Sequence, residues 1–361
     1  MLRILGNCHS TGIGSLPLEG LAESHQLINK TFPLIPHWPQ LPKLGESEGF
    51  INQYLTLLIE IGLIKAESGR TPYFDTYRQD FTDLLTEFYS LYLEASEGDS
   101  EALNRFGFAP GSARGFYSFV DQVKGGYYDE AKLLKGQVSG PITLGLQVTD
   151  ADRKASFYND QLRDVLTKTL ALNGRWQANM LAKLGLPVII FIDDPGLYSL
   201  GLATHITLTK EGITSELEEV VEAIKAAGAA VGSHTCAGTD WSLLFAMDIE
   251  VVNFDAYEYF SSISIFPGEI NVFLEKGGIL AFGIVPTSEK ILSESMDSLV
   301  DLFSQQVDIL GEKGVNKKRL LKQVMITPSC GTGSLSEENA LTIYQTTNAV
   351  SKAIRKKFQL D

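Results

Sequence analysis

Cysteine is scarce in this sequence: the 361 residues include three, Cys8, Cys236 and Cys330. A small, odd number argues against a disulfide framework. Long apolar runs are also missing, because no stretch reaches the ~18 apolar residues that a membrane-spanning helix needs. The N-terminus MLRILGNCHSTG lacks the apolar core and cleavage site of a signal peptide. We therefore expect neither a membrane anchor nor a secreted, cross-linked protein.

The sequence also lacks long clusters of basic residues. The formal net charge is −14, and the three adjacent basic residues 355–357 fit a helix end, where cations suit the helix dipole. Nucleic-acid binding is disfavoured, since phosphate contacts need grouped lysines and arginines. No G-x-G-x-x-G follows a strand-like run and no G-x-x-x-x-G-K-[ST] occurs, which argues against dinucleotide and P-loop sites. The acidity is typical of a cytoplasmic protein.

Short apolar runs that end in polar or glycine-rich residues recur along the chain and indicate buried parallel strands. The clearest lie at 133–145, 187–196, 229–238, 249–257, 278–286 and 323–333, and the opening stretch 2–17 is expected to hold the first strand. Helical spacing marks 157–184, 214–228, 296–314 and 336–358, the last capped by Ser336. This alternation predicts a parallel α/β architecture.

Two folds satisfy the alternation, a closed (β/α)8 TIM barrel and an open doubly wound sheet. At least five expected strands carry polar or metal-binding residue types at their C-terminal ends, where barrel active sites lie, whereas an open sheet usually has one switch point. We therefore predict one catalytic barrel domain over residues 1–361. The less regular stretch 18–132, with a proline-rich loop at 32–46, is expected to elaborate the barrel mouth.

Two cysteines and one histidine follow strand-like runs directly. His234 and Cys236 are one residue apart after one run, and Cys330 follows a run almost a hundred residues later. Each alone is more often a buried or hydrogen-bonded structural residue. Together, one imidazole and two thiolates suit Zn²⁺, and three protein ligands with an exchangeable position are the catalytic pattern. Cys8 and His9 are not expected to bind metal.

A carboxylate offers a weaker fourth ligand. The run VVNFDAYEY supplies Asp255, the expected ligand, and Glu258, the alternative. Zinc lowers the pKa of a coordinated thiol, and the thiolate is the reactive nucleophile at neutral pH. Two cysteines and one carboxylate place three negative charges around the metal, which suits alkyl transfer to a bound thiol better than water activation.

Six motifs, in order along the chain, now point to a known family: TGIGSLP (11–17), GPIT (140–143), FIDDPG (191–196), HTC (234–236), VVNFD (251–255) and PSCG (328–331). With them the chain resembles the catalytic, C-terminal half of cobalamin-independent methionine synthase. The wider superfamily includes uroporphyrinogen decarboxylase, which needs no zinc, and the methylcobalamin:coenzyme M methyltransferases, which use a similar His-x-Cys and a later Cys. TGIGSLP and IDDPG favour the methionine synthase side.

The resemblance implies a zinc site and a (β/α)8 barrel. His234, Cys236 and Cys330 match the family's zinc ligands, and Asp255 falls where the family has a glutamate ligand. The metal implied is zinc, and the reaction implied is methyl transfer to a thiol.

The resemblance also implies a site for the amino-acid part of homocysteine. Asp193 matches the family aspartate that holds the amino group, and we expect it to be a catalytic and substrate-binding residue. Asp194 stands where the family has glutamate. Ile13, Gly14 and Ser15 match the loop that binds the amino-acid carboxylate.

Two departures concern the methyl donor. The chain has no room for the second barrel that helps hold folate in the long enzymes, and its segment AFGIVPTS (281–288) lacks the histidine that helps protonate the folate leaving group. We therefore expect the methyl donor to be a methylated corrinoid, carried on a separate protein, rather than methyl-tetrahydrofolate. In the alternative, Glu289 or His9 supplies the proton to the leaving group and the donor is still a folate. The alternative functions are a coenzyme M methyltransferase and a non-catalytic barrel that binds a corrinoid, porphyrin or thiol.

Overall fold

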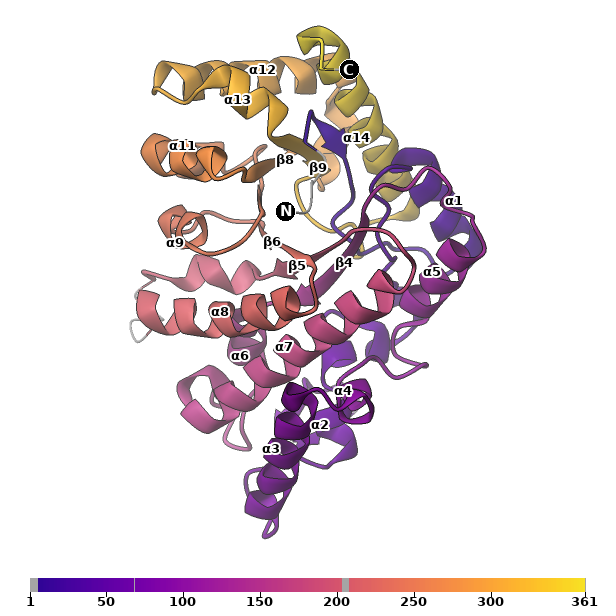
Figure 1. Cartoon of the computed structure of the whole chain (residues 1–361), viewed down its shortest axis with the longest axis vertical. Helices are drawn as coiled ribbons and strands as arrows, with labels where there is room; N and C mark the ends of the chain where they lie inside the picture. The colour runs from indigo at the N-terminus through magenta and orange to yellow at the C-terminus, as the bar shows by residue number, and fades with distance from the viewer. Residues whose placement is uncertain (1–5, 68, 203–207, 361) are drawn as a thin grey trace.

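The centre of the computed structural model, which describes residues 6–67, 69–202 and 208–360, is a curled seven-stranded sheet (Figure 1). The strand order is β1-β9-β8-β7-β6-β5-β4, and every neighbouring pair is parallel. The strands are β1 (His9–Ser10), β4 (Leu134–Ser139), β5 (Val188–Asp193), β6 (Ala230–Thr235), β7 (Val251–Phe254), β8 (Ile279–Val285) and β9 (Val324–Pro328). A separate antiparallel pair is formed by β2 (Ile64–Lys65) and β3 (Tyr73–Phe74).

Helices cover the outer face of the curl (Figure 1). Those that follow β4 are α6 (Pro141–Gln147), α7 (Asp160–Ala182), α8 (Lys210–Ala226), α9 (Trp241–Ala246), α10 (Phe260–Ile263), α11 (Pro267–Glu275), α12 (Met296–Glu312), α13 (Lys317–Lys322) and α14 (Glu337–Phe358). The N-terminal part supplies α1 (Leu21–Thr31), α2 (Thr56–Glu60), α3 (Phe81–Glu97), α4 (Ser100–Arg105) and α5 (Arg114–Lys124). The helices α2, α3 and α4 extend away from the sheet at the lower end of Figure 1.

Residues of the central strands are buried on both faces of the sheet, as parallel strands require. One set packs under the helices in the large core. The alternate set forms a smaller apolar core inside the curl, from Ile35, Leu133, Ile189, Phe191, Ala230, Val251, Ile279, Ala281 and Met325. Towards the C-terminal ends of the strands the inward positions become polar, and the strand register sets Asp193 beside His234 and His234 beside Asn253.

Residues 36–40 lie between the two edge strands of the sheet. On one side the Trp38 amide donates to the Lys135 carbonyl of β4 (3.4 Å), and on the other the Gln40 amide donates to the Gly14 carbonyl beyond β1 (3.0 Å). The two prolines of this segment lack an N–H, so only isolated bridges form rather than a ladder. The regular eight-stranded barrel that we predicted is therefore not what the structure shows, which is a seven-stranded curled sheet with its edges bridged by an irregular segment.

All six clear strand predictions are confirmed, and β1 lies within the expected first stretch, of which residues 2–5 are outside the described part. The four predicted helices correspond to α7, α8, α12 and α14, and the Ser336 side chain caps the last by accepting from the Asn339 amide (3.2 Å). The start of α8 is different: Thr209, four to five residues earlier than expected, caps the helix. The helices α1, α5, α6, α9, α10, α11 and α13 were not predicted. Among the described helices, none is long and apolar enough to cross a membrane.

A buried histidine generates a prediction about stability. The ring nitrogens of His25 on α1 are hydrogen-bonded to the hydroxyls of Tyr128 (2.9 Å) and Ser118 (2.7 Å), and burial lowers the pKa of His25 to about 4. An unfolded histidine titrates near 6.5, so the stabilisation is complete above that pH and is lost as pH falls towards 4. Between pH 7 and pH 5, denaturant unfolding should show the wild type losing roughly 1–2 kcal/mol more than His25→Gln. Equal pH slopes in the two proteins would contradict this assignment.

Candidate metal centre

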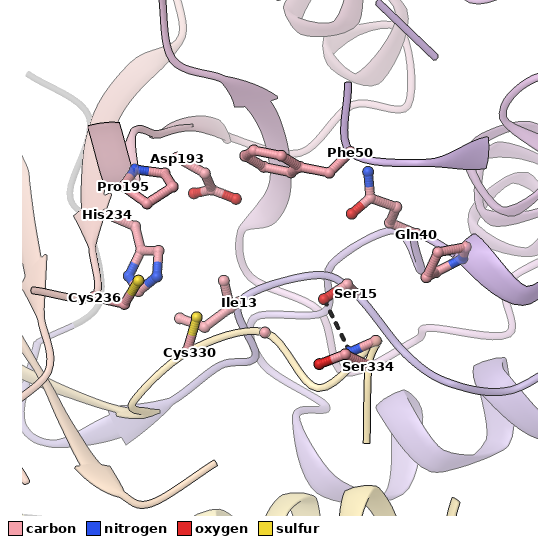
Figure 2. A pocket seen from close by; sticks show the side chains of 13 residues that line it. Ile13, Ser15, Gln40, Phe50, Asp193, Pro195, His234, Cys236, Cys330 and Ser334 are labelled. Atoms are coloured by element: carbon pink, nitrogen blue, oxygen red, sulfur yellow. Dashed lines mark hydrogen bonds between the residues drawn. The ribbon is translucent and has the colours of Figure 1, made fainter. Parts of the chain in front are cut away.

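His234, Cys236 and Cys330 come together at one end of a cavity (Figure 2). His234 is the fifth residue of β6, Cys236 follows that strand directly, and Cys330 lies two residues beyond β9. Their ligand atoms all lie within 4.8 Å of one another, and His234 is buried. Because β6 and β9 are parallel members of the same curled sheet, their C-terminal ends meet at the same edge. The structure thus brings the three predicted metal ligands together.

The orientation of the His234 ring is set by Asn253 on β7. The Asn253 amide nitrogen donates to the Ala281 carbonyl (2.9 Å) and to the Thr327 hydroxyl (2.7 Å). Since a carbonyl can only accept, the amide oxygen is the atom that faces His234, and it is hydrogen-bonded to the ring Nδ1. Nδ1 therefore carries the proton. The buried Nε2 has no partner among the described residues, which leaves its lone pair free for a metal.

The two thiols interact with each other. The contact with Cys330, together with the nearby His234, lowers the pKa of Cys236 although burial opposes the shift. The pKa of Cys330 is raised because its proton is held between the two sulfur atoms and because the thiol is largely buried. Together with the unpartnered imidazole nitrogen, the two sulfur atoms form a donor set that fits Zn²⁺.

Asp255 lies just after β7 and is buried, but it is not part of the group of ligand atoms described above. One of its carboxylate oxygens accepts from the Glu258 amide (2.8 Å), and burial raises the pKa of Asp255 to about 6. The Glu258 side chain is engaged at the rim, where it pairs with Lys290 (2.5 Å). Which of the two carboxylates serves as a fourth ligand therefore stays a prediction.

The predicted substrate-binding acids have different surroundings. Asp193 lines the cavity beside His234, and its Oδ1 is buried without a hydrogen-bond partner in the described part of the chain. Burial raises the pKa of Asp193 to about 6, against the opposing effect of the Lys135 charge. Asp194, the next residue, turns the other way. It accepts from the amides of Ile142 (3.0 Å) and Thr143 (2.9 Å) at the start of α6, and it does not line the cavity.

The loop of Ile13, Gly14 and Ser15 is brought to the cavity by contacts with the C-terminal loop. Ile13 and Ser15 line the cavity, and the Ser15 hydroxyl accepts from the Gly333 amide (3.2 Å). Gly14 has a φ of +153°, and a Cβ there would lie 2.6 Å from the amide nitrogen of Gln137. The positive φ therefore favours glycine at this turn, and a Cβ would also displace the Gln137 side chain.

The cavity has a volume of about 370 Å³ and extends away from the metal ligands. Part of its wall was not predicted from the sequence, and this part consists of Gln40, Pro42, Phe50, Pro195, Gly331, Gly333 and Ser334. Figure 2 shows Gln40 and Phe50 at the end away from the cysteines. The proline-rich loop at 32–46 was the available signal for this wall, but nothing in its composition says which residues face inward. Cys8 and His9 lie outside the group of ligand atoms formed by His234, Cys236 and Cys330.

Comparison with protein-family models finds no match, and comparison with curated proteins finds no significant match. Among solved structures, the chain is similar to a B12-independent methionine synthase from Shewanella sp. W3-18-1 in complex with selenomethionine, with 15% identity, a TM-score of 0.48 and 67% of each chain covered. It is also similar to a Bacteroidetes-affiliated GH5 cellulase, with 8% identity, a TM-score of 0.39, and 68% of this chain and 79% of that chain covered. Likenesses this distant say nothing about activity.

The Asn253 contact leads to a test of the metal centre. The purified protein should bind one Zn²⁺, and Asn253→Ala should weaken that binding by about 10–100-fold, because His234 loses the partner that fixes its ring and tautomer. Competition with a chromophoric chelator measures the affinity. Thr327→Val is the matched control: it removes one of two contacts to the Asn253 amide and should have a smaller effect. A wild-type protein that binds no zinc would show that the arrangement is not a zinc site, and unchanged affinity in Asn253→Ala would show that Asn253 does not orient the His234 ligand.

Proposed function

We propose that this protein is a zinc-dependent methyltransferase whose methyl acceptor is a thiol, most simply homocysteine, which would become methionine. The observation that carries the proposal is the convergence of two unpartnered groups in one cavity: the His234 Nε2 beside two cysteines, and the Asp193 carboxylate oxygen a short way along the wall. The first group suits a metal, and the second suits a cationic substrate group. Homocysteine carries a thiol and an ammonium on one short chain.

His234, Cys236 and Cys330 would hold the zinc, with Asp255 or Glu258 as the proposed fourth ligand. When bound, zinc lowers the pKa of a coordinated substrate thiol, so that the thiolate is available as a nucleophile at neutral pH. The protein's own contribution is orientation. Asp193 accepts hydrogen bonds from the substrate ammonium, and the loop of Ile13, Gly14 and Ser15 faces the carboxylate, to which the Ser15 hydroxyl donates. Asp194 acts indirectly, because its hydrogen bonds to α6 fix the end of β5 that carries Asp193.

The proposed role of Asp193 predicts selectivity among thiols. Asp193→Asn removes the charge that pairs with the substrate ammonium, and such charge-assisted contacts are worth about 1.5–3 kcal/mol. Homocysteine should therefore bind roughly 10–100-fold more weakly, whereas coenzyme M, which has no ammonium, should be much less affected. Calorimetric titration of the zinc-loaded proteins with both thiols measures this difference. Equal losses for the two thiols would contradict the homocysteine assignment.

A corrinoid carried by a separate protein is the proposed methyl donor. Demethylating tetrahydrofolate releases a nitrogen leaving group that must be protonated, which needs a general acid, whereas methylcobalamin releases cob(I)alamin without a proton. Residues 281–285 of the stretch 281–288 lie in β8, and this stretch contains no histidine. His234 is the one histidine among the described residues that line the cavity, and Glu289 and His9 do not line it. This arrangement supports the corrinoid over the folate.

An assay of donors tests the proposal directly. Zinc-loaded protein is given homocysteine with either free methylcobalamin or methyl-tetrahydrofolate, and methionine is followed by chromatography. We expect methionine from methylcobalamin and little from the folate. Turnover with the folate alone would overturn the donor assignment but keep the methyltransferase. Tight thiol or corrinoid binding without any transfer would favour the non-catalytic alternative.

A further inference from the structure

Lys135 on β4 is the one lysine or arginine buried among the described residues, with 1% of its surface exposed. It occupies an inward position of the curled sheet, below the floor of the cavity that it does not line. Burying an ammonium removes it from water, which is costly unless other groups compensate. Burial accordingly lowers the pKa of Lys135 to about 8, although the charge of Asp193 opposes the shift. Such a costly placement calls for a reason other than packing.

The contacts of this ammonium are with the elements that carry the substrate side of the site. Its Nζ donates to the Ile13 carbonyl, in the loop that turns at Gly14. The same nitrogen lies 4.6 Å from the ring centroid of Phe191, which is two residues before Asp193 on β5. The ammonium makes no ion pair within 4.0 Å in the described part of the chain, so its charge is not cancelled by a direct partner.

Apart from His234, the ionisable groups at the inner end of the cavity are acidic. Asp193 and two cysteines line it, and Asp255 is buried nearby. A thiol that also carries an ammonium is attracted by this field, but a thiol that carries a carboxylate is repelled. In an environment of low polarity a single buried cation at about 8 Å changes the binding of an anion by on the order of 10-fold or more.

We propose that Lys135 is a positioning residue that allows the cavity to accept the carboxylate of an amino-acid thiol. Its ammonium is hydrogen-bonded to the Ile13 carbonyl and so holds this loop in place. Its positive charge, beneath the cavity, reduces the repulsion that the acidic groups exert on a substrate carboxylate. The inference rests on the proposed function, because it concerns the substrate of the same site. It adds a requirement that the metal ligands and Asp193 do not impose: the substrate must be zwitterionic or anionic at the end away from sulfur.

Three short thiols that differ in charge separate this role from a purely structural one. Homocysteine carries both charges, 3-mercaptopropionate carries only a carboxylate, and cysteamine carries only an ammonium. Their dissociation constants are measured by calorimetry with zinc-loaded wild type, Lys135→Met and Lys135→Gln. Lys168→Met is the control, since Lys168 on α7 is ion-paired with Asp164 and Glu219 and does not line the cavity.

In both Lys135 variants we expect homocysteine and 3-mercaptopropionate to bind about 10-fold more weakly or worse, and cysteamine to bind as well as in the wild type or more tightly. The Lys168→Met protein should keep wild-type values for all three. Equal losses of all three thiols in a folded Lys135 variant would show that the residue has only a structural role and would overturn the inference. Binding to the wild type is measured before any variant is made. If the wild type binds none of the three thiols, both the proposed function and this inference are wrong.

Discussion

The parallel pairing of β5, β6 and β7 is the constraint on which the rest of the site depends. Its register sets Asp193 beside His234 and His234 beside Asn253, so that the proposed substrate-binding acid, the proposed metal ligand and the residue that orients this imidazole occupy neighbouring inward positions. Asn253 in turn is held by contacts to β8 and β9, through Ala281 and Thr327. Four strands therefore cooperate in fixing a single imidazole nitrogen, and a slip of one residue in any of them would turn the inward side chain to the opposite face.

Because successive residues of a strand point to opposite faces, the adjacent carboxylates Asp193 and Asp194 have different surroundings. Asp193 ends β5 facing the cavity, and Asp194 faces the N-terminus of α6, where backbone amides satisfy it. One acid is thus left with an unused oxygen while its neighbour is saturated. A buried, unsatisfied carboxylate oxygen costs free energy, as does the buried Lys135 ammonium. Both costs occur within the same few residues of the cavity floor, which is where a bound ligand could offset them.

How much of this could be predicted from sequence differs between the two halves of the chain. The six later strands were readable because each is a short apolar run ending in polar residues, and the metal ligands were readable because His234, Cys236 and Cys330 directly follow such runs. The buried position of Lys135 could not be predicted, because a lysine within an apolar strand gives no indication of which face of the sheet its side chain occupies. The segment 36–40 was hidden too: its prolines argue against a strand, and its place between β1 and β4 comes from pairing with residues distant in sequence.

The two ends of the cavity are built from different kinds of structure. The metal end is built on regular strands, whose ladders hold the ligand atoms in place, whereas Gln40, Pro42 and Phe50 at the opposite wall come from a stretch with only isolated bridges and short turns. Substitutions at the partly exposed wall positions would therefore affect few ladder hydrogen bonds, whereas Trp38 and Leu41 of the same stretch are fully buried and pack into the core. The proposed metal ligands and Asp193 thus lie on or directly after regular strands, and the opposite wall of the cavity comes from a less regular part of the fold.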